Sequence, residues 1–135
     1  MLIDTHTHLY LDKFREDIDD VISKAIEQDV RMMLLPNIDS DSIDDVFDLY
    51  KKYPFHIRPM VGLHPCSVNE KYRYELDQLE KHLVKGGVVA IGEIGIDLYW
   101  DKSFEKQQIE AFEIQIDWAL AHELPIVIHS RNAIK

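Results

Sequence analysis

The stretch Met1-Leu2-Ile3-Asp4-Thr5-His6-Thr7-His8 opens the chain with a short apolar run that leads directly into two histidines. Side chains in an extended strand alternate between two faces, so His6 and His8 should point the same way. Neutral imidazole is the commonest protein metal ligand, and two imidazoles on one face can hold one ion. A His-x-His pair is also common in proteins that bind no metal, so its meaning depends on the rest of the chain.

Five short runs of aliphatic and β-branched residues predict strands that are covered on both faces. They span residues 2–5, 30–35, 56–63, 88–93 and 125–129. Between them, apolar residues recur at helical spacing and predict four helices. The four stripes are Ile18, Val21, Ile22 and Ala25; Ile43, Val46, Phe47 and Tyr50; Tyr72, Leu76, Leu79 and Leu83; and Ile109, Phe112, Ile116 and Ala119. We expect Ser40 or Asp41 to cap the second helix and Gly86-Gly87 to end the third.

The alternation of strands and helices predicts an α/β fold with parallel strands and right-handed crossovers. An open doubly wound sheet and part of a (β/α)₈ barrel both fit this order. No Gly-x-Gly-x-x-Gly follows the first strand, which disfavours a dinucleotide-binding sheet. Because we find no linker and no low-complexity segment, we predict a single domain over residues 1–135.

Composition limits the class of protein. A hydrophobic content of 46% is normal for a globular domain. The formal net charge of −10 argues against a broad basic nucleic-acid surface, although bound divalent cations can supply positive charge where a phosphate sits. Cys66 is the single cysteine, and no apolar run approaches the roughly 18 residues of a membrane span. We therefore expect a cytoplasmic protein without a secretory signal or membrane contact.

Candidate site residues gather at the predicted carboxyl ends of the strands, where parallel α/β folds place their sites. His6 and His8 end the first strand, His64 follows the third, Glu93 ends the fourth and His129 ends the fifth. Three histidines and a carboxylate can hold a divalent ion or part of a two-metal site. Glu93 is the natural bridge, because one carboxylate can give one oxygen to each ion.

Several of these residues have a purely structural alternative. Glu93 could be a buried carboxylate paired with Arg131, and His129 could be a core histidine bonded to the backbone. His64 precedes a proline, which suits a turn, so we place it near the site without assigning it as a ligand. Arg131 can hold a phosphate oxygen with its forked donors, or it can pair with a nearby carboxylate.

Further polar and aromatic residues suit supporting roles. Asp4 shares the predicted strand face of the two histidines and could accept a hydrogen bond from a ligand imidazole. Asp97 suits a loop acceptor or a helix cap. Tyr99 and Trp100 follow the fourth strand and fit two roles equally well: stacking on a substrate base, or covering the end of a barrel.

Four motifs in this order resemble the TatD family of metal-dependent deoxyribonucleases: residues 3–8, Gly62-Leu63-His64-Pro65, residues 92–97 and residues 125–131. The resemblance runs the whole length of the chain. It implies a (β/α)₈ TIM barrel of the amidohydrolase-like superfamily, of which residues 1–135 would be the amino-terminal half, with about five β/α units. Glu93 stands where other amidohydrolase-like enzymes often carry a carboxylated lysine, which favours this family.

The resemblance also implies a function and roles for the site residues. It implies a two-metal phosphodiesterase that trims DNA, often from the 3′ end, with Mg, Mn, Zn or a similar divalent ion. By the family pattern, His6 and His8 bind one ion, Glu93 bridges as a catalytic ligand, and His129 binds the second ion. Asp4, His64, Asp97 and Arg131 remain candidates for contacts with substrate or with the ligands.

The family pattern continues with a histidine after a sixth strand and an aspartate, expected to activate the attacking water, after an eighth. A complete (β/α)₈ barrel needs about 250 residues. We therefore expect residues 1–135 alone to have absent or impaired activity, and their unpaired first and fifth strands to favour self-association. Two other functions stay open: a catalytically silent, self-associating half-barrel fragment, and a metal-dependent hydrolase of small phosphate or acyl esters.

Overall fold

In the computed structural model, which describes residues 1–134, five parallel strands form one sheet in the order β1-β2-β3-β4-β5. The strands are β1 (Leu2–Asp4), β2 (Val30–Pro36), β3 (Ile57–Val61), β4 (Ala90–Asp97) and β5 (Ile126–Arg131). The helices between them are α1 (Ile18–Glu27), α2 (Ile43–Lys52), α3 (Tyr72–Leu83) and α4 (Glu105–Ala121). Two short 3-10 turns, η1 (Asp12–Phe14) and η2 (Pro65–Ser67), follow β1 and β3. The predicted order of elements is confirmed.

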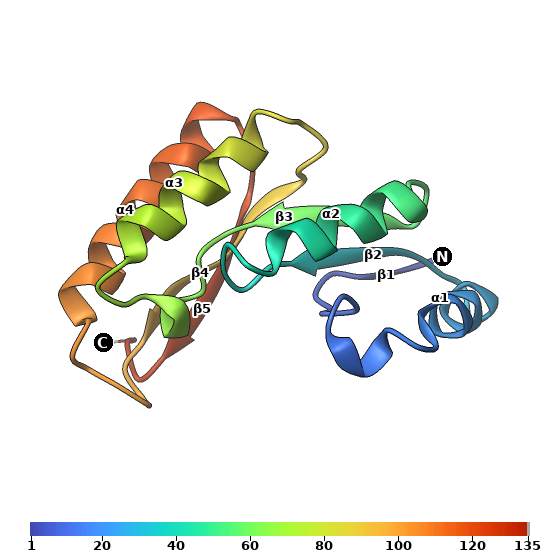
Figure 1. The fold of residues 1–135 in the computed structure, drawn as a ribbon, viewed down its shortest axis with the longest axis horizontal. Coiled ribbons are helices and arrows are strands. Elements are labelled where there is room, and N and C mark those ends of the chain that lie inside the picture. Colours follow the sequence, from blue (N-terminus) through green and yellow to red (C-terminus); the bar gives the residue numbers. More distant parts are fainter. Residues whose placement is uncertain (135) are drawn as a thin grey trace.

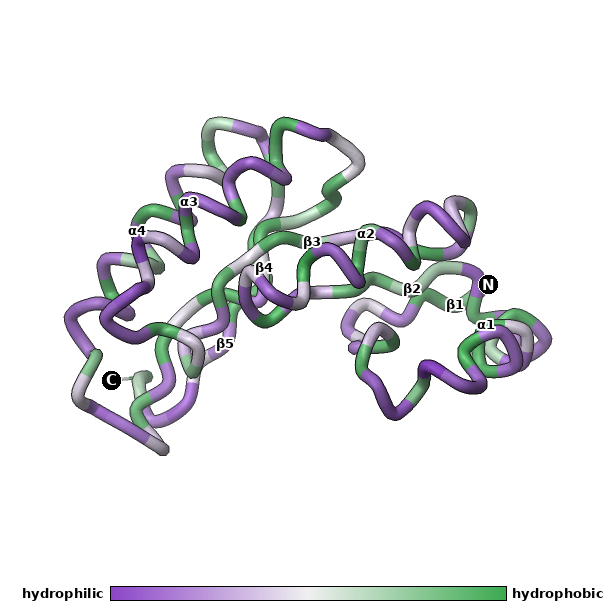
Figure 2. Tube along the Cα trace, viewed as in Figure 1, coloured by the Kyte–Doolittle hydropathy of each residue, from purple (hydrophilic) through white to green (hydrophobic). Residues whose placement is uncertain are grey.

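The sheet curls into half of a (β/α)₈ barrel, with α2, α3 and α4 on one side of it (Figure 1). Because β1 and β5 are the end strands of this order, each pairs with one neighbour only. The tube in Figure 2 shows the same arrangement by hydropathy: hydrophobic residues line the strands, and hydrophilic residues recur along the outer turns of the helices. The carboxyl ends of the strands therefore meet at one open edge of the curled sheet.

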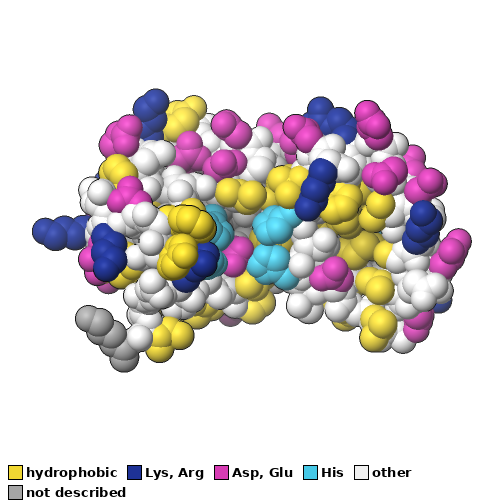
Figure 3. Space-filling view, turned by 90° about the horizontal axis from the view of Figure 1, so that it is seen from below, with side chains coloured by type: hydrophobic (Ala, Val, Ile, Leu, Met, Phe, Trp, Pro, Cys, Tyr) yellow, Lys and Arg dark blue, Asp and Glu magenta, His cyan; other side chains and the backbone are white. Residues whose placement is uncertain are grey.

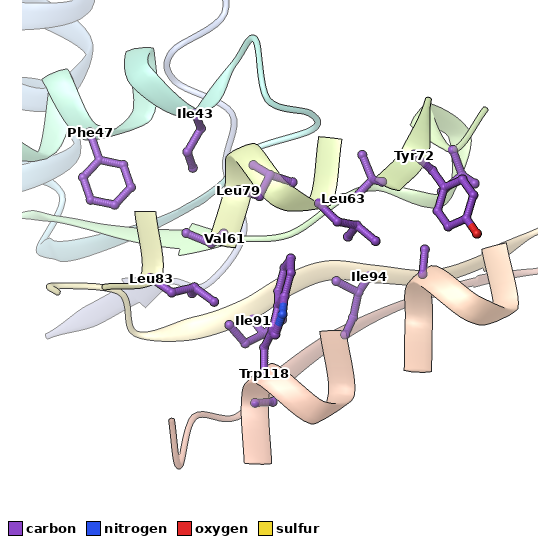
Figure 4. Packing of buried hydrophobic residues seen from close by; sticks show 14 residues of the cluster. Ile43, Phe47, Val61, Leu63, Tyr72, Leu79, Leu83, Ile91, Ile94 and Trp118 are labelled. Carbon is purple, nitrogen blue, oxygen red and sulfur yellow. The ribbon is translucent and has the colours of Figure 1, made fainter. Parts of the chain in front are cut away.

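The core forms in two clusters because each helix turns an apolar face to the sheet. The first cluster joins α2, α3 and α4 to β3 and β4, and Figure 4 shows Trp118 of α4 packed beside Ile91 and Ile94 of β4. The second cluster lies between α1, α2, β2 and the segment after β1, around Ile22 and Leu35. The predicted stripes of α1, α2 and α3 supply most of the helical side chains of both clusters.

Helix α4 buries a different face from the predicted one. Ile109 of the predicted stripe is 39% exposed, and of that stripe only Ala119 is fully buried. The buried residues are Gln108, Ala111, Gln115, Trp118 and Ala119. The prediction failed because two glutamines lie on the inner face, where hydropathy alone does not place them; their amides bind backbone, as described below.

Helix ends are shifted slightly from prediction. Helix α2 begins after Ser42, not after Ser40 or Asp41, and the Asp39 carboxylate accepts the Ser42 N–H at 3.0 Å. Helix α3 ends at Leu83, and the two glycines that follow, Gly86 and Gly87, have φ of +80° and +83°. Glycine adopts this left-handed conformation without a steric penalty. Among the described residues, no helix combines the length and the apolar character that crossing a bilayer would need.

Candidate metal centre

Two histidines and a glutamate form the first group of possible metal ligands. The Nε2 atoms of His6 and His8 lie 3.2 Å apart, and His6 Nε2 lies 3.3 Å from Oε2 of Glu93. One donor atom from each of the three residues fits within 4.8 Å of the others. Ligand atoms about 2.1 Å from a common tetrahedral ion are about 3.4 Å apart. The observed spacing therefore fits a single cation.

The two histidines reach this position differently from the sequence prediction. Strand β1 ends at Asp4, so His6 and His8 lie beyond the strand and its alternation of faces does not place them. The chain turns after β1, and the N–H of Thr7 donates to the carbonyl of Leu34, in β2, at 3.1 Å. This bond fixes the segment between the two histidines against the neighbouring strand.

A second group of donor atoms surrounds the same glutamate. His129 Nδ1 lies 3.1 Å from Glu93 Oε1, and His64 Nε2 lies 3.7 Å from Glu93 Oε2. Figure 3 shows two groups of histidine side chains in a hollow of this face, with an acidic side chain between them. Glu93 is thus the residue that both groups share.

Glycines in β4 allow Glu93 and His129 to come together. The register between β4 and β5 shifts between Ile91 and Ile94, so Glu93 lies in an irregular part of the ladder. A Cβ at Gly92 would lie 2.6 Å from Cβ of Val127. A Cβ at Gly95, whose φ is +140°, would overlap the carbonyl oxygen of His129. Larger residues at these positions would push β5 away. The strand also continues to Asp97, four residues past its predicted end.

Asp97 determines which nitrogen of His129 faces Glu93. The Oδ2 atom of Asp97 lies 2.8 Å from His129 Nε2, and a carboxylate can only accept, so Nε2 carries the proton. Nδ1 lies 3.1 Å from Glu93 Oε1, and if Glu93 held a cation, the deprotonated Nδ1 would bind that cation as well. Burial opposes the charge of Asp97, but the Tyr99 N–H and the His129 ring lower the pKa of its carboxyl below the ordinary value.

His64 has the opposite arrangement of ring nitrogens. Its Nδ1 accepts the backbone N–H of Cys66 at 3.1 Å, so in the neutral ring the proton sits on Nε2, which faces Glu93. Burial lowers the pKa of His64 and favours this neutral form. In this tautomer His64 is a hydrogen-bond donor toward the centre and not a metal ligand.

Tyr10 supports His8 and was not predicted. Its hydroxyl lies 2.8 Å from His8 Nδ1, which leaves Nε2 free to face His6. Burial and the neighbouring His6 lower the pKa of His8, so its imidazole is neutral near pH 7, as metal binding requires. A tyrosine two residues after a His-x-His pair is the sequence signal that could have indicated this contact.

Two predicted residues have other contacts than expected. Asp4 is exposed, and its carboxylate accepts the backbone N–H of His6 at 3.1 Å, so it holds the turn and does not bind an imidazole. Arg131 does not take the predicted alternative of an ion pair with Glu93. Its guanidinium carbon lies 3.9 Å from the ring centroid of Tyr99.

Three buried amides hold the backbone around the centre. Gln115 accepts the Leu63 N–H at 2.6 Å, one residue before His64, and Gln108 accepts the N–H of Asp97 at 2.9 Å. Asn37 bonds both backbone groups of Gly62, accepting its N–H at 2.8 Å and donating to its carbonyl at 2.9 Å. Each amide thus gives a buried backbone group the hydrogen-bond partner that it needs. Composition and periodicity gave no sign of them.

Three comparisons with known proteins agree. Residues 3–135 match the model of the TatD related DNase family. The chain is 35% identical over 133 residues to the uncharacterized metal-dependent hydrolase YabD of Bacillus subtilis, covering 98% of this chain and 52% of that protein. It is 30% identical over 132 residues to the 3′-5′ ssDNA/RNA exonuclease TatD of Salmonella typhimurium, covering 98% and 50%.

A solved structure supports the fold. The crystal structure of the TatD homologue YjjV from Escherichia coli superposes with a TM-score of 0.88 at 29% identity, covering 97% of this chain and 51% of that one. The chain therefore spans about half the length of the curated relatives it matches.

Proposed function

Since the chain belongs to the TatD related DNase family, we propose that it supplies one half of the active site of a divalent-metal-dependent hydrolase that cleaves phosphodiester bonds in DNA. The observation that carries this proposal is the shared contact of Glu93: one carboxylate oxygen faces His6 and the other faces His129. Such an arrangement suits two cations held side by side. A single-stranded substrate cut from the 3′ end is supported by the name of the Salmonella relative.

The donor set indicates which residues would hold the ions. His6, His8 and Glu93 would bind one cation, and Glu93 with His129 would contribute to a second. Imidazole nitrogen and carboxylate oxygen are ligands that zinc, manganese and similar divalent ions accept. When bound, these cations polarise a phosphate oxygen and lower the pKa of a bound water so that it can attack phosphorus.

The other residues orient the substrate and the ligands. Asp97 fixes the ring of His129, and Tyr10 fixes the ring of His8. His64 Nε2–H, directed at Glu93 and 16% exposed, is placed to donate a hydrogen bond to a substrate phosphate oxygen. Its hydrogen bond from Cys66 keeps that proton on Nε2.

The test uses the chain extended through strand eight and a single-stranded oligonucleotide labelled at either end, with added Mg²⁺, Mn²⁺ or Zn²⁺. A ladder of products shortened from the 3′ end is expected, and Glu93→Gln should lower the rate by about a thousandfold or more, because it removes a shared ligand. Glu80→Gln, at an exposed glutamate of α3, is the matched control and should leave the rate unchanged.

Residues 1–135 should be compared with a chain extended through strand eight, with both proteins shown to be folded. We expect the shorter chain to be at least about a hundredfold slower, because the remaining ligands and the water-activating aspartate of the family pattern are outside it. Hydrolysis of a small chromogenic phosphate or acyl ester, with no action on the oligonucleotide, would instead identify a small-ester hydrolase. Equal rates would show that the active site is complete within these residues.

A further inference from the structure

Two exposed aromatic rings and one arginine lie together beyond the carboxyl end of β4. Tyr99 is 52% exposed and Trp100 is 72% exposed. Their ring centroids are 4.7 Å apart with an interplanar angle of 90°. The guanidinium carbon of Arg131 lies 3.9 Å from the Tyr99 centroid and 5.4 Å from the Trp100 centroid. Exposed aromatic area is costly, so this cluster is a candidate binding surface.

This cluster is tied to the metal centre through Asp97. One oxygen of the Asp97 carboxylate contacts the His129 ring, and the other accepts the N–H of Tyr99 at 3.0 Å. The N–H of Leu98 donates to the carbonyl of Arg131 at 3.0 Å. Because His129 and Arg131 are two residues apart in β5, their side chains leave the same face of the strand. The aromatic cluster is therefore held in a fixed position next to the histidines.

The side chains of this cluster are of the types that stack on planar rings. A planar guanidinium stacked on an aromatic ring offers a flat, positively charged surface that neither a lysine nor an aliphatic patch provides. Both aromatic rings and guanidinium planes stack on nucleobases, and every base has a face suited to this contact. Figure 3 shows hydrophobic side chains and a basic side chain gathered beside the histidines, on a molecule whose net charge is −10.

We propose that Tyr99, Trp100 and Arg131 form a stacking site for an unpaired nucleobase of the strand whose phosphate lies at the metal centre. This stacking site rests on the proposed function. It adds that the nucleobase is the recognised part of the substrate and that these three side chains recognise it. Stacking requires a base that is free of its complement, so this site selects single strands and frayed ends over intact duplex. It is tolerant of sequence, because it reads a ring face and not a hydrogen-bonding edge.

The test compares two probes that share their phosphates and differ in their bases. One is a short phosphorothioate oligothymidylate, and the other is a phosphorothioate strand of the same length made of abasic sugars. Binding of each to the Mn²⁺-loaded protein is measured by calorimetry and by tryptophan fluorescence. Trp118 is 7% exposed and packs in the core, so quenching by a stacked base reports on Trp100.

We expect the oligothymidylate to bind at least about fivefold more tightly than the abasic strand and to quench the fluorescence, whereas the abasic strand should not quench. Trp100→Ala and Tyr99→Ala should each reduce the affinity ratio between the probes toward one. Arg131→Lys, which keeps the charge but removes the planar group, should also reduce the ratio. Tyr74→Ala, at a tyrosine of α3 that is 60% exposed, is the matched control and should keep the full ratio.

Equal affinity of the two probes for the parent protein, without quenching, would overturn the stacking site while leaving the proposed hydrolase intact. A preference for the oligothymidylate that survives in Trp100→Ala and Tyr99→Ala would place base recognition elsewhere and also overturn it. Failure of both strands to bind would contradict the proposed nucleic-acid function itself.

Discussion

His129 Nε2 lies 2.8 Å from Asp97 Oδ2, while Nδ1 of the same ring lies 3.1 Å from Glu93. The imidazole is thus held between two carboxylates that have different roles. Asp97 is buried at the end of β4 and accepts a hydrogen bond from Nε2, whereas Glu93 lies beside Nδ1, the nitrogen that a cation held by Glu93 would bind. Metal affinity should therefore depend on a residue that would not itself touch the ion.

Replacing Asp97 with asparagine removes the charge that fixes the His129 tautomer. We expect Asp97→Asn to weaken Zn²⁺ or Mn²⁺ binding by about 10–100-fold, the usual effect of losing a partner of a ligand histidine. Isothermal calorimetry on folded protein measures this directly. Asp101→Asn is the control, because the exposed Asp101 accepts a Ser103 N–H, which an asparagine oxygen can also do. Unchanged affinity in Asp97→Asn would refute this role.

Replacing His6 and His8 should remove most of the protein's capacity to bind transition metal. We expect a His6→Ala/His8→Ala double variant to retain far less transition metal than the parent, because two of the three donors of the first group are lost. Elemental analysis after dialysis gives the metal-to-protein ratio. His122→Ala, at an exposed histidine that follows α4, should match the parent. Equal metal in the double variant and the parent would show that these histidines are not ligands.

The buried amide of Gln115 should contribute to stability more than its polarity suggests. Gln115→Leu leaves the N–H of Leu63 without its acceptor in a buried position, which costs about 1–3 kcal/mol of the free energy of unfolding. Urea denaturation measures the loss. Gln107→Leu is the control, because it makes the same replacement of an amide by an aliphatic side chain at a partly buried position of the same helix. It should alter the free energy of unfolding by less than about 0.5 kcal/mol. Similar losses in both variants would contradict the prediction.

Cys66 should react unusually slowly with alkylating reagents. Although Cys66 is exposed, partial desolvation of its sulfur, followed by the hydrogen bond and negative charge of Asp97, raises the pKa of the thiol to about 11. Only the thiolate is nucleophilic, so the reaction becomes fast only as the pH rises toward 11. At pH 8 we expect alkylation by iodoacetamide about a hundredfold slower than that of a free thiol of pKa about 8.5. Asp97→Asn should raise the rate; a parent rate equal to that of the free thiol would be the contrary result.

The end strands should drive association of residues 1–135. Apolar side chains of these strands are exposed: Leu2 is 59%, Ile3 48%, Ile126 38% and Ile128 56%. Because each end strand also has an unpaired edge of backbone N–H and C=O groups, which can pair with another chain, we expect oligomers in size-exclusion chromatography with light scattering. Ile128→Lys should shift the distribution toward monomer, and Val84→Lys, at an exposed position after α3, should not. A monomeric parent at high concentration would contradict this expectation.

The sequence predicted the order of strands and helices best, because the burial of apolar side chains determines both the hydrophobic pattern and the fold. The continuous apolar runs at β2 and β5 and the helical spacing of the stripes of α1, α2 and α3 made the element order predictable, although β5 is not covered on both faces as its run predicted. The buried face of α4 was not, because Gln108 and Gln115 are buried through bonds to backbone that lies far away in sequence. The grouping of the candidate ligands was predicted from strand ends, although Glu93 and His129 lie within their strands and not at their ends. The turn that brings His6 to His8, the Tyr10 contact and the ring orientation of His64 depend on tertiary contacts.

The position of Glu93 between the two groups of donors has a thermodynamic consequence. If both groups hold cations, the two binding equilibria cannot be independent, since each ion alters the carboxylate that the other needs. The coupling free energy must be reciprocal: whatever the first ion does to the affinity for the second, the second does to the first. Repulsion between the two cations makes that coupling unfavourable, and a bridging phosphate would reduce it. Substrate and the weaker ion should therefore bind with positive cooperativity.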